Sequence, residues 1–395
     1  MERIIHAITK QYLRELDKDL EFAYLYGSLA QRNYDPNESD VNLLLVVSNR
    51  VSIHHMRDIF RPIWETYGRQ IRRAPLIATR NTLARHMLLR PYFAHHLVHD
   101  GQSLLGGNLL DQMPPLPDLA DHDAYAYLAY DALLASAALG AGMVPAEEAA
   151  ADLLRLRRIA RRFLGEALPP DAPATAVFGR IQDHLDPAVH ALPTDQPWAS
   201  DRTATSPLLP GLQTTYIRDQ ETMVLVFSHL SANQIDTIAW DKLAGRLAKD
   251  YRRLLVTSSV QYRLIHQFER PLDLVFRRSQ PTWGLDPLAD LQTTRRLQMR
   301  HAARTPADIQ LDTLTNAYLT AADDEIHQVI HDYQNRLLNV RLENELLNRF
   351  GLVEKFSEPR PLPDREAPIT ERVDAIFQHL SWWSDYYAKK MLQAA

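Results

Sequence analysis

The sequence contains no cysteine, which excludes disulfide bonds, thiolate metal sites and cysteine nucleophiles. It also lacks a long apolar run. The longest, from Ala132 to Val144, has about 13 residues, whereas a helix that spans a bilayer needs about 20. The charged segment from Met1 to Leu16 has no apolar core of the signal-peptide type. We therefore expect no transmembrane helix, no membrane partner and a cytoplasmic location.

Strong net charge is missing as well. The chain carries 44 basic and 49 acidic residues, a formal net charge of −5, so nucleic acid is not an expected partner of the chain as a whole. Only seven of the basic residues are lysine. Arginine suits bidentate contacts with phosphate or carboxylate, although codon usage in a GC-rich genome also explains such a bias.

The length and patterning predict two or three domains. With 395 residues, 46% of them apolar, the chain exceeds one ordinary domain. The first segment reads as alternating helices and strands, because short apolar runs alternate with helical spacing. Helices are expected over Met1–Leu16, Ser52–Gly68 and Asn81–Asp100, and strands over Glu21–Tyr26, Val41–Val47 and Arg73–Thr79.

The remainder of the chain is predicted to be mostly helical, with proline-rich connections. A hairpin is expected over Gln213–Phe227, turning at Asp219 and Gln220. We find no internal repeat. The predicted domains are residues 1–110, 111–212 and 213–395, so the expected fold is an α/β domain with a mixed sheet and flanking helices, followed by a mostly α-helical C-terminal region. Long helices are expected over Asp241–Glu269, from Thr305 to Phe350, and from Thr370 to Met391.

One motif carries chemistry. Gly27 and Ser28 follow the first predicted strand, and after a polar loop Asp40 and Asn42 open the second. This order of helix, strand, Gly-Ser, loop, Ser-Asp and strand resembles the nucleotidyltransferases of the polymerase-β superfamily, especially their minimal and antibiotic-modifying members. The resemblance covers roughly residues 1–110. The family pattern is Gly-Ser, about ten residues, then Asp-x-Asp.

The resemblance implies a nucleotide site. Glycine lets the backbone approach a triphosphate and serine can donate to a phosphate oxygen, while carboxylates at i and i+2 share one face of a strand and can hold two Mg²⁺ ions. By this resemblance Asp40 and Asn42 are the catalytic and metal-binding residues. The cofactors are Mg²⁺ and a nucleoside triphosphate, and an acceptor hydroxyl attacks the α-phosphorus with release of pyrophosphate. The implied nucleotide-binding residues are Gly27, Ser28, Arg32 and Ser39.

The sequence departs from the family pattern at the acids. Asn42 is neutral where the second carboxylate belongs, and Arg73–Thr79 offers no third carboxylate. The loop holds eleven residues rather than ten, and the usual arginine position is Gln31, with Arg32 one residue later. Two Mg²⁺ ions bring a charge of +4. The three carboxylates of the family pattern compensate −3 of it, whereas Asp40 alone supplies −1 in this sequence. Asp35, Glu38, Asp58 and Glu65 are either substitute ligands or surface acids.

Three hypotheses follow for function, and the sequence leaves open whether the chain is an enzyme. The first is an active nucleotidyltransferase with an altered site. The second is a catalytically degenerate relative that binds a nucleotide or acts as a protein-interaction scaffold. The third is a chance resemblance on an unrelated α/β domain.

Weaker patterns each have two interpretations. His95 and His99, at i and i+4, indicate a metal site or ordinary helix-end chemistry. Arg155, Arg158 and Arg162 indicate an anion-binding face or a salt-bridged surface. The apolar seam of the 326–347 helix indicates self-association or a protein partner, or packing against the last helix of the same chain. The seam residues are Ile326, Ile330, Tyr333, Leu337, Val340, Asn344 and Leu347.

Overall fold

A computed structural model describes residues 1–32, 34–36, 39–107, 120–165, 168–193, 209–278, 280–354, 363–364 and 366–394. The chain forms two compact units. Unit 1 joins Met1–Asp118 to Gln298–Ala395, and unit 2 is Leu119–Leu297. The chain thus divides differently from the predicted boundaries after residues 110 and 212, because the last hundred residues pack with the first segment.

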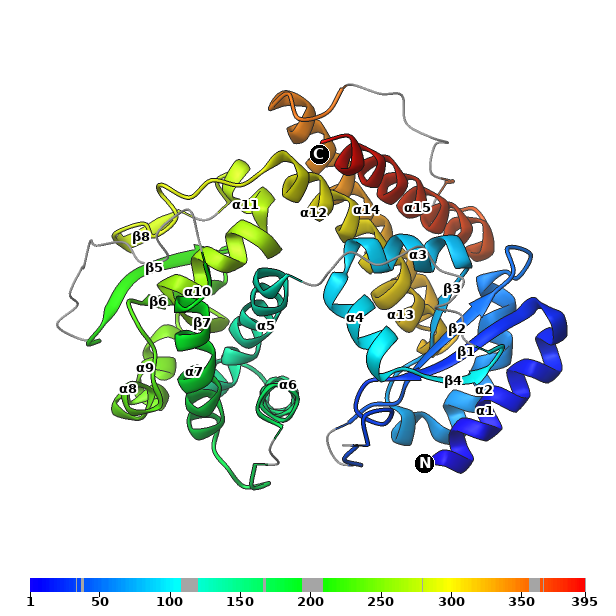
Figure 1. Cartoon of the computed structure of the whole chain (residues 1–395), viewed down its shortest axis with the longest axis horizontal. Helices are drawn as coiled ribbons and strands as arrows, with labels where there is room; N and C mark the ends of the chain where they lie inside the picture. The colour runs from blue at the N-terminus through cyan, green and yellow to red at the C-terminus, as the bar shows by residue number, and fades with distance from the viewer. Residues whose placement is uncertain are drawn as a thin grey trace. The chain divides into compact units, whose positions relative to one another are not determined.

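Unit 1 is a mixed α/β structure (Figure 1). Its sheet has the order β3-β2-β1-β4, in which β1 is antiparallel to β2 and β4, and β2 is parallel to β3. The predicted mixed sheet with flanking helices is confirmed. The elements are α1 (Glu2–Leu16), η1 (Asp17–Asp19), β1 (Leu20–Tyr26), β2 (Asn42–Val47), α2 (Ile53–Ile71), β3 (Leu76–Ala78), α3 (Arg80–Leu89), α4 (Pro91–Asp100), β4 (Gln102–Leu105), α12 (Arg295–Asp308), η5 (Ile309–Leu314), α13 (Thr315–Thr320), α14 (Ile326–Arg349) and α15 (Ile369–Gln393).

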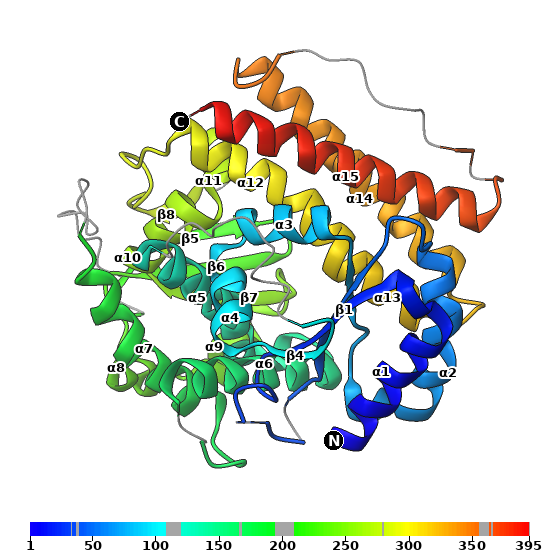
Figure 2. The same ribbon diagram turned by 45° about the vertical axis from the view of Figure 1, so that its right-hand side comes forward.

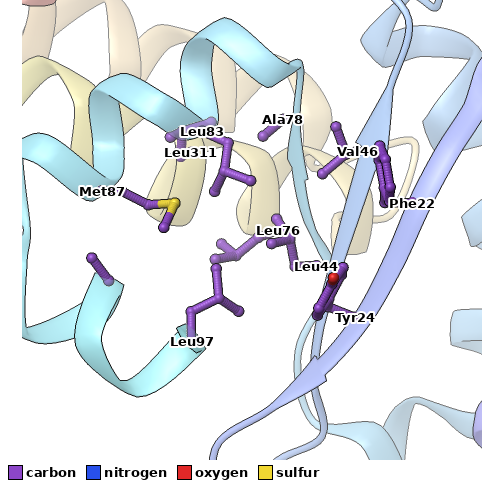
Figure 3. Close-up of a cluster of buried hydrophobic side chains, with 11 residues drawn as sticks. Phe22, Tyr24, Leu44, Val46, Leu76, Ala78, Leu83, Met87, Leu97 and Leu311 are labelled. Carbon is purple, nitrogen blue, oxygen red and sulfur yellow. The ribbon is translucent and has the colours of Figure 1, made fainter. Parts of the chain in front are cut away.

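Alternation along the strands builds the core of unit 1. Phe22 and Tyr24 of β1 point to the same face as Leu44 and Val46 of β2, and α3 and α4 cover that face. Leu311 of η5 joins this cluster from a distant part of the sequence (Figure 3). On the other face, α1 contacts both β1 and α2. The inner strands β1 and β2 are therefore buried on both sides, which explains the nearly continuous apolar sequence of β2.

The last two helices of unit 1 lie side by side (Figure 2). The predicted seam of α14 is buried apart from Asn344, whose Oδ1 accepts a hydrogen bond from the hydroxyl of Tyr387 at 2.5 Å. The side chain of Arg372 donates to Gln334 at 2.8 Å. The seam therefore packs against α15 within the chain. The single long helix predicted from Thr305 to Phe350 is wrong, because α13 ends at Thr320 and α14 begins at Ile326.

Unit 2 contains a second mixed sheet, so the prediction of a mostly helical C-terminal region is only partly right. The predicted hairpin is confirmed as β5 and β6, whereas the single helix predicted over Asp241–Glu269 is wrong, since it contains the buried strand β7. The elements are α5 (Asp121–Ala135), η3 (Ser136–Met143), α6 (Ala146–Leu164), α7 (Ala174–His190), β5 (Leu212–Arg218), β6 (Thr222–Phe227), α8 (Ala232–Thr237), α9 (Trp240–Leu247), β7 (Arg253–Ser258), α10 (Ser259–Leu264), η4 (Ile265–Glu269), α11 (Pro271–Val275) and β8 (Pro281–Gly284).

The two sheets have the same topology. The order β7-β6-β5-β8 repeats the order, and the parallel or antiparallel direction, of every neighbour in unit 1. The irregularities coincide as well. The register shift between Leu20 and Phe22 corresponds to the one between Leu212 and Thr214, and both first strands shift again one residue later against the fourth strand. The expectation of no internal repeat is therefore wrong at the level of structure.

The segment after the third strand of each sheet also repeats. Thr79 and Ser258 cap the following helix with their side chains. A histidine, three further residues and Arg-Pro then follow, beginning in α3 for His86–Pro91 and in η4, directly after α10, for His266–Pro271. Both histidines are buried. In both copies the proline begins the next helix, as expected for a residue without a backbone N–H.

Each sheet is packed with helices that follow the other sheet in the sequence. The segment after β4 contributes α5, η3, α6 and α7 to unit 2, and the segment after β8 contributes η5, α13, α14, α15 and most of α12 to unit 1. Within unit 2, α5 and η3 contact β7, and within unit 1, η5 and α13 contact β3. The two units are therefore built on one plan.

One helical stretch, Asp121–Met143, is long and apolar enough to cross a membrane by length and composition. However, 61% of its apolar window is buried inside the folded chain, as is usual for a helix at the core of a unit. It is therefore weak evidence for a membrane span, and the cytoplasmic location stays a prediction.

The repeat gives a matched test of backbone packing. Gly106 and Gly284 end the fourth strands with φ of +88° and +87°, and a Cβ at either would lie 2.2 Å from a carbonyl oxygen of the first strand, that of Glu21 or Gln213. We expect Gly106→Ala to lower the free energy of unfolding of unit 1 by about 2 kcal/mol. Gly107, with φ +71° and open space around it, is the control, because Gly107→Ala should cost about 1 kcal/mol. Urea unfolding measures both, and equal losses would contradict the role of close packing.

Candidate functional site

The chain turns sharply where β1 ends. Gly27 has φ +75°, and a Cβ there would lie 2.7 Å from Nδ2 of Asn42, so this position favours glycine for its backbone conformation and for close contact. The backbone N–H of Gln31 donates to the carbonyl of Gly27 at 3.0 Å, and its side chain donates to Asp100 at 2.7 Å. The turn that carries Gly27 and Ser28 is thus fixed against β2 and the end of α4.

The loop that follows leads into Asp40. Arg32 is exposed and has φ +62°. Ser39 is buried, its Oγ accepts the N–H of Asp35 at 3.0 Å, and its own N–H donates to the carbonyl of Asp35 at 2.7 Å. Ser39 therefore shapes the loop through its contacts with the backbone of Asp35. Glu38, a candidate substitute ligand, lies outside the described residues.

Asp40 and Asn42 meet as the i, i+2 spacing predicts. Nδ2 of Asn42 donates to Oδ1 of Asp40 at 3.2 Å. The guanidinium of Arg73, which precedes β3, fills the position beside them. Its Nη1 donates to Oδ1 of Asn42 at 3.2 Å and lies 4.0 Å from Oδ2 of Asp40. The strand that lacks the expected third carboxylate thus supplies a cation instead.

A second carboxylate reaches this cluster from the C-terminal helices of unit 1. Nη2 of Arg73 donates to Oδ1 of Asp312 at 2.5 Å. Asp312 lies in η5, a π-helical turn of a kind often found at functional sites, and the buried side chain of Leu311 anchors that turn in the core. The side chain of Asn316 also accepts the N–H of Ala74 at 2.8 Å. These contacts hold Asp312 opposite the start of β3.

The electrostatics of the cluster keep Arg73 charged. Burial alone would lower the pKa of Arg73, but its neighbours, chiefly Tyr26 and Asp312, hold that pKa above its ordinary value. Arg73 contributes +1 and Asp40 and Asp312 contribute −1 each, while Asn42 is neutral. The residues therefore fit a pair of Mg²⁺ ions poorly, because a permanent cation already lies between the oxygen atoms that would bind them.

Sequence reasoning missed the role of two residues. The sequence marks Arg73 only as part of a strand without a carboxylate, and an arginine in place of the expected acid is the one signal that could have found it. Asp312 lies 239 positions after Arg73 in the sequence, within a segment that is expected to be one uninterrupted helix. No sequence signal identifies it.

The other acidic candidates have ordinary surroundings. Glu65 pairs with Arg61 at 3.1 Å, one turn earlier on α2, and Asp58 is an exposed residue of the same helix. The rings of His95 and His99 lie 4.2 Å apart. Among the residues that the structure describes, neither histidine belongs to a group of three clustered metal-ligating side chains.

The arginines of α6 have partners within unit 2. Arg155 forms an ion pair with Asp131, and Arg162 lies 6.0 Å from the ring centroid of Tyr127. The salt-bridged interpretation of this helix is therefore supported for Arg155.

Unit 2 offers no second copy of the Gly-Ser, loop, Asp-x-Asn motif. The loop between the first two strands of unit 1 runs from Gly27 to Val41, whereas β5 and β6 are joined by Asp219–Glu221 alone. Asp219 and Gln220 both have positive φ, as in tight hairpin turns. The candidate site therefore occurs once in the described chain, in unit 1.

Comparison with known proteins does not assign the chain to a family. No family model, no curated protein and no solved structure matches the chain. The resemblance to nucleotidyltransferases therefore rests on the motif residues, and their geometry must carry any functional proposal.

Proposed function

We propose that unit 1 binds a nucleotide through its phosphates and does not transfer it. The observation that carries this proposal is the guanidinium of Arg73, which bonds to Asn42 and lies 4.0 Å from Asp40. Guanidinium is a permanently charged, planar donor that suits phosphate oxygens. It can take over part of the charge compensation that metal ions give a triphosphate.

Charge argues against turnover with two metal ions. Asp40, Asp312 and Arg73 together give the cluster a charge of −1, whereas two Mg²⁺ ions would bring +4. A guanidinium also cannot lower the pKa of an acceptor hydroxyl by direct coordination, as a metal ion does. The cluster therefore retains a means to hold phosphate and lacks the usual means to activate an attacking group.

The turn after β1 supplies the remaining contacts. Ser28 lies half-buried in the turn that Gly27 opens, and Arg32 is exposed at its end. A hydroxyl donor and a second cation on one short turn suit a phosphate chain. Nucleotide affinity should therefore depend little on Mg²⁺.

Calorimetric titration of the full chain with ATP, GTP, CTP and UTP tests the proposal. At least one nucleotide is expected to bind with affinities that agree within about threefold with and without Mg²⁺. Arg73→Ala should weaken that binding about tenfold or more, because a charged hydrogen bond to phosphate is lost.

Arg14→Ala is the matched control, since Arg14 is 73% exposed and pairs with the adjacent Glu15; its affinity should equal that of the wild type. Silence in all titrations would overturn nucleotide binding and leave two interpretations, a protein-interaction scaffold and a chance resemblance on an unrelated α/β domain. Strict dependence on Mg²⁺ would contradict the role given to Arg73.

A second candidate function is nucleotidyl transfer itself. Asp312 favours it, because Arg73 brings this carboxylate into the same cluster as Asp40. Pyrophosphate release after a panel of hydroxyl-bearing acceptors is added to the Mg²⁺-containing samples is the deciding readout. Release that disappears in Asp40→Ala would establish transfer, and binding without release would support the first proposal.

A further inference from the structure

Three metal-ligating side chains meet in unit 2, away from any residue used above. Asp186 and His190 lie one turn apart on α7, and His229 follows β6. One oxygen or nitrogen atom from each lies within 4.8 Å of the others. Oδ2 of Asp186 is 3.9 Å from Nε2 of His190 and accepts a hydrogen bond from Nδ1 of His229. The i, i+4 spacing on α7 brings Asp186 and His190 together, and the end of β6 adds His229 at the same place.

Asp186 is a buried charge without a fixed cation. Its side chain is 0% exposed, whereas the imidazoles of His190 and His229 are 40% and 55% exposed. Its remaining partners are the amide of Gln261 at 3.1 Å and the N–H of Leu230 at 3.5 Å. Within the described residues no lysine or arginine pairs with it. A buried carboxylate without a cation is costly, and a bound divalent ion would compensate this charge.

The surroundings orient the carboxylate. The side-chain amide of Gln261 donates to Oδ1 of Asp186 and also to Oε1 of Gln182 at 2.6 Å, and all three residues are buried. This network leaves Oδ2 facing the two imidazoles. Supporting hydrogen bonds of this kind are typical around metal ligands.

The turn that carries His229 is also fixed. Oδ1 of Asp183, on the same helix as Asp186, accepts the N–H of Ala232 at 2.9 Å. The N–H of Ser228 donates to the carbonyl of Gly211 at 2.9 Å. Both ends of the turn are therefore anchored, so ion binding requires little reorganisation of the backbone.

We propose that Asp186, His190 and His229 bind a divalent late transition-metal ion, with Zn²⁺ as the best match to these ligands. One carboxylate and two imidazoles suit Zn²⁺, whereas Mg²⁺ prefers oxygen ligands alone. Tetrahedral coordination places ligand atoms ~3.3 Å apart, which rotation of the exposed imidazoles can reach. Three protein ligands leave a fourth position open to water.

The site is confined to one unit. In the matching sheet register, Val47 corresponds to Phe227, so Asn49 takes the place of His229. One ion per chain is therefore expected. The proposal is independent of nucleotide binding, which involves unit 1.

Zn²⁺ titration of the chelator-treated full chain tests the proposal, with Co²⁺ absorption as a second readout. The wild type is expected to bind one equivalent, and His190→Ala should weaken binding about tenfold or more, since one of three ligands is lost. His184→Ala is the control, because His184 is exposed on the same helix and its ring nitrogen lies 3.0 Å from the carbonyl of Arg180.

His190→Ala keeps the hydrogen bonds of Asp186, so circular dichroism should match the wild type, and His229→Ala provides a second loss of a ligand. The proposal is overturned if the folded wild type binds no Zn²⁺. It is equally overturned if His184→Ala weakens binding as much as His190→Ala, which would indicate scattered surface histidines.

Discussion

Replacing Arg90 with alanine is expected to lower the free energy of unfolding of unit 1 by about 3 kcal/mol. Nε of Arg90 donates to Oδ1 of Asp308 at 2.9 Å, and Nη2 donates to the other carboxylate oxygen. Burial would raise the pKa of Asp308, but Arg90, together with Arg304 and His86, holds it below its ordinary value. Arg90→Ala leaves this carboxylate, 23% exposed, with Arg304 at 3.9 Å, and an undercompensated charge in a largely buried site costs about 3 kcal/mol.

Hydrogen exchange of β1 and β2 measures this loss, with β5 and β6 of unit 2 as an internal reference. Arg90→Met combined with Asp308→Leu should recover at least half of the stability, because a largely buried ion pair can be replaced by apolar packing. Arg14→Ala should have no effect. A loss below 1 kcal/mol in Arg90→Ala would show that the pair does not bear on the stability of unit 1.

The strands of unit 1 could be predicted because the sequence contains short apolar runs that are typical of buried strands. β2 is apolar at five successive positions, and only a strand buried on both faces combines such a run with so short a length. The Gly-Ser turn and the pairing of Asp40 with Asn42 are equally local. Residues close in sequence need only local backbone geometry to meet, so pattern reasoning succeeds there.

β7 could not be predicted by the same reasoning. Its apolar residues fit a helical spacing with those of α9 and α10, so the three elements read as one helix. Parallel pairing with β6 decides the conformation, and its partner residues are about 30 positions away. Tertiary pairing thus overrides local periodicity, and Asp241–Glu269 does not form the single helix that its pattern predicts.

The repeat cannot be recognised from the sequence because the two copies share few identical residues. Ser48 and Ser228 follow the second strands, and each copy has one His-x-x-x-Arg-Pro sequence. The long loop of unit 1 is reduced to a hairpin turn in unit 2, and apolar residues exchange freely elsewhere. Topology and register preserve what the amino-acid sequence no longer shows.

The candidate site likewise contains residues that the sequence predicts and contacts that only the fold reveals. Gly27, Ser28, Asp40 and Asn42 could be found from their spacing, whereas the salt bridge from Arg73 to Asp312 joins segments that only folding brings together. The missing acids pointed to a weakened metal site. The guanidinium of Arg73 in their place is the physical reason that we give for a poor fit of Mg²⁺. It is also the basis of the proposal that nucleotide binding depends little on Mg²⁺.

Acid is expected to destabilise unit 1 well above the pH at which carboxylates protonate. Burial lowers the pKa of His86 to about 4 from its ordinary 6.5, with Arg90 and Arg85 acting in the same direction and Asp308 and Asp312 opposing them. Between these values the unfolded chain binds a proton that the folded chain excludes. The contribution of neutral His86 is therefore complete above pH 6.5 and is lost as the pH falls to about 4, by about 3 kcal/mol.

Urea unfolding at pH 7, 5.5 and 4 measures this dependence, and His86→Leu isolates it. The variant removes the titrating group, so its stability should fall less steeply over that interval. His266, the counterpart of His86 in unit 2, also has a lowered pKa because of burial, and it is present in both proteins and cancels in the comparison. Parallel pH profiles for wild type and His86→Leu would show that the folded chain protonates His86 as readily as the unfolded chain does, contrary to its buried position beside Phe93.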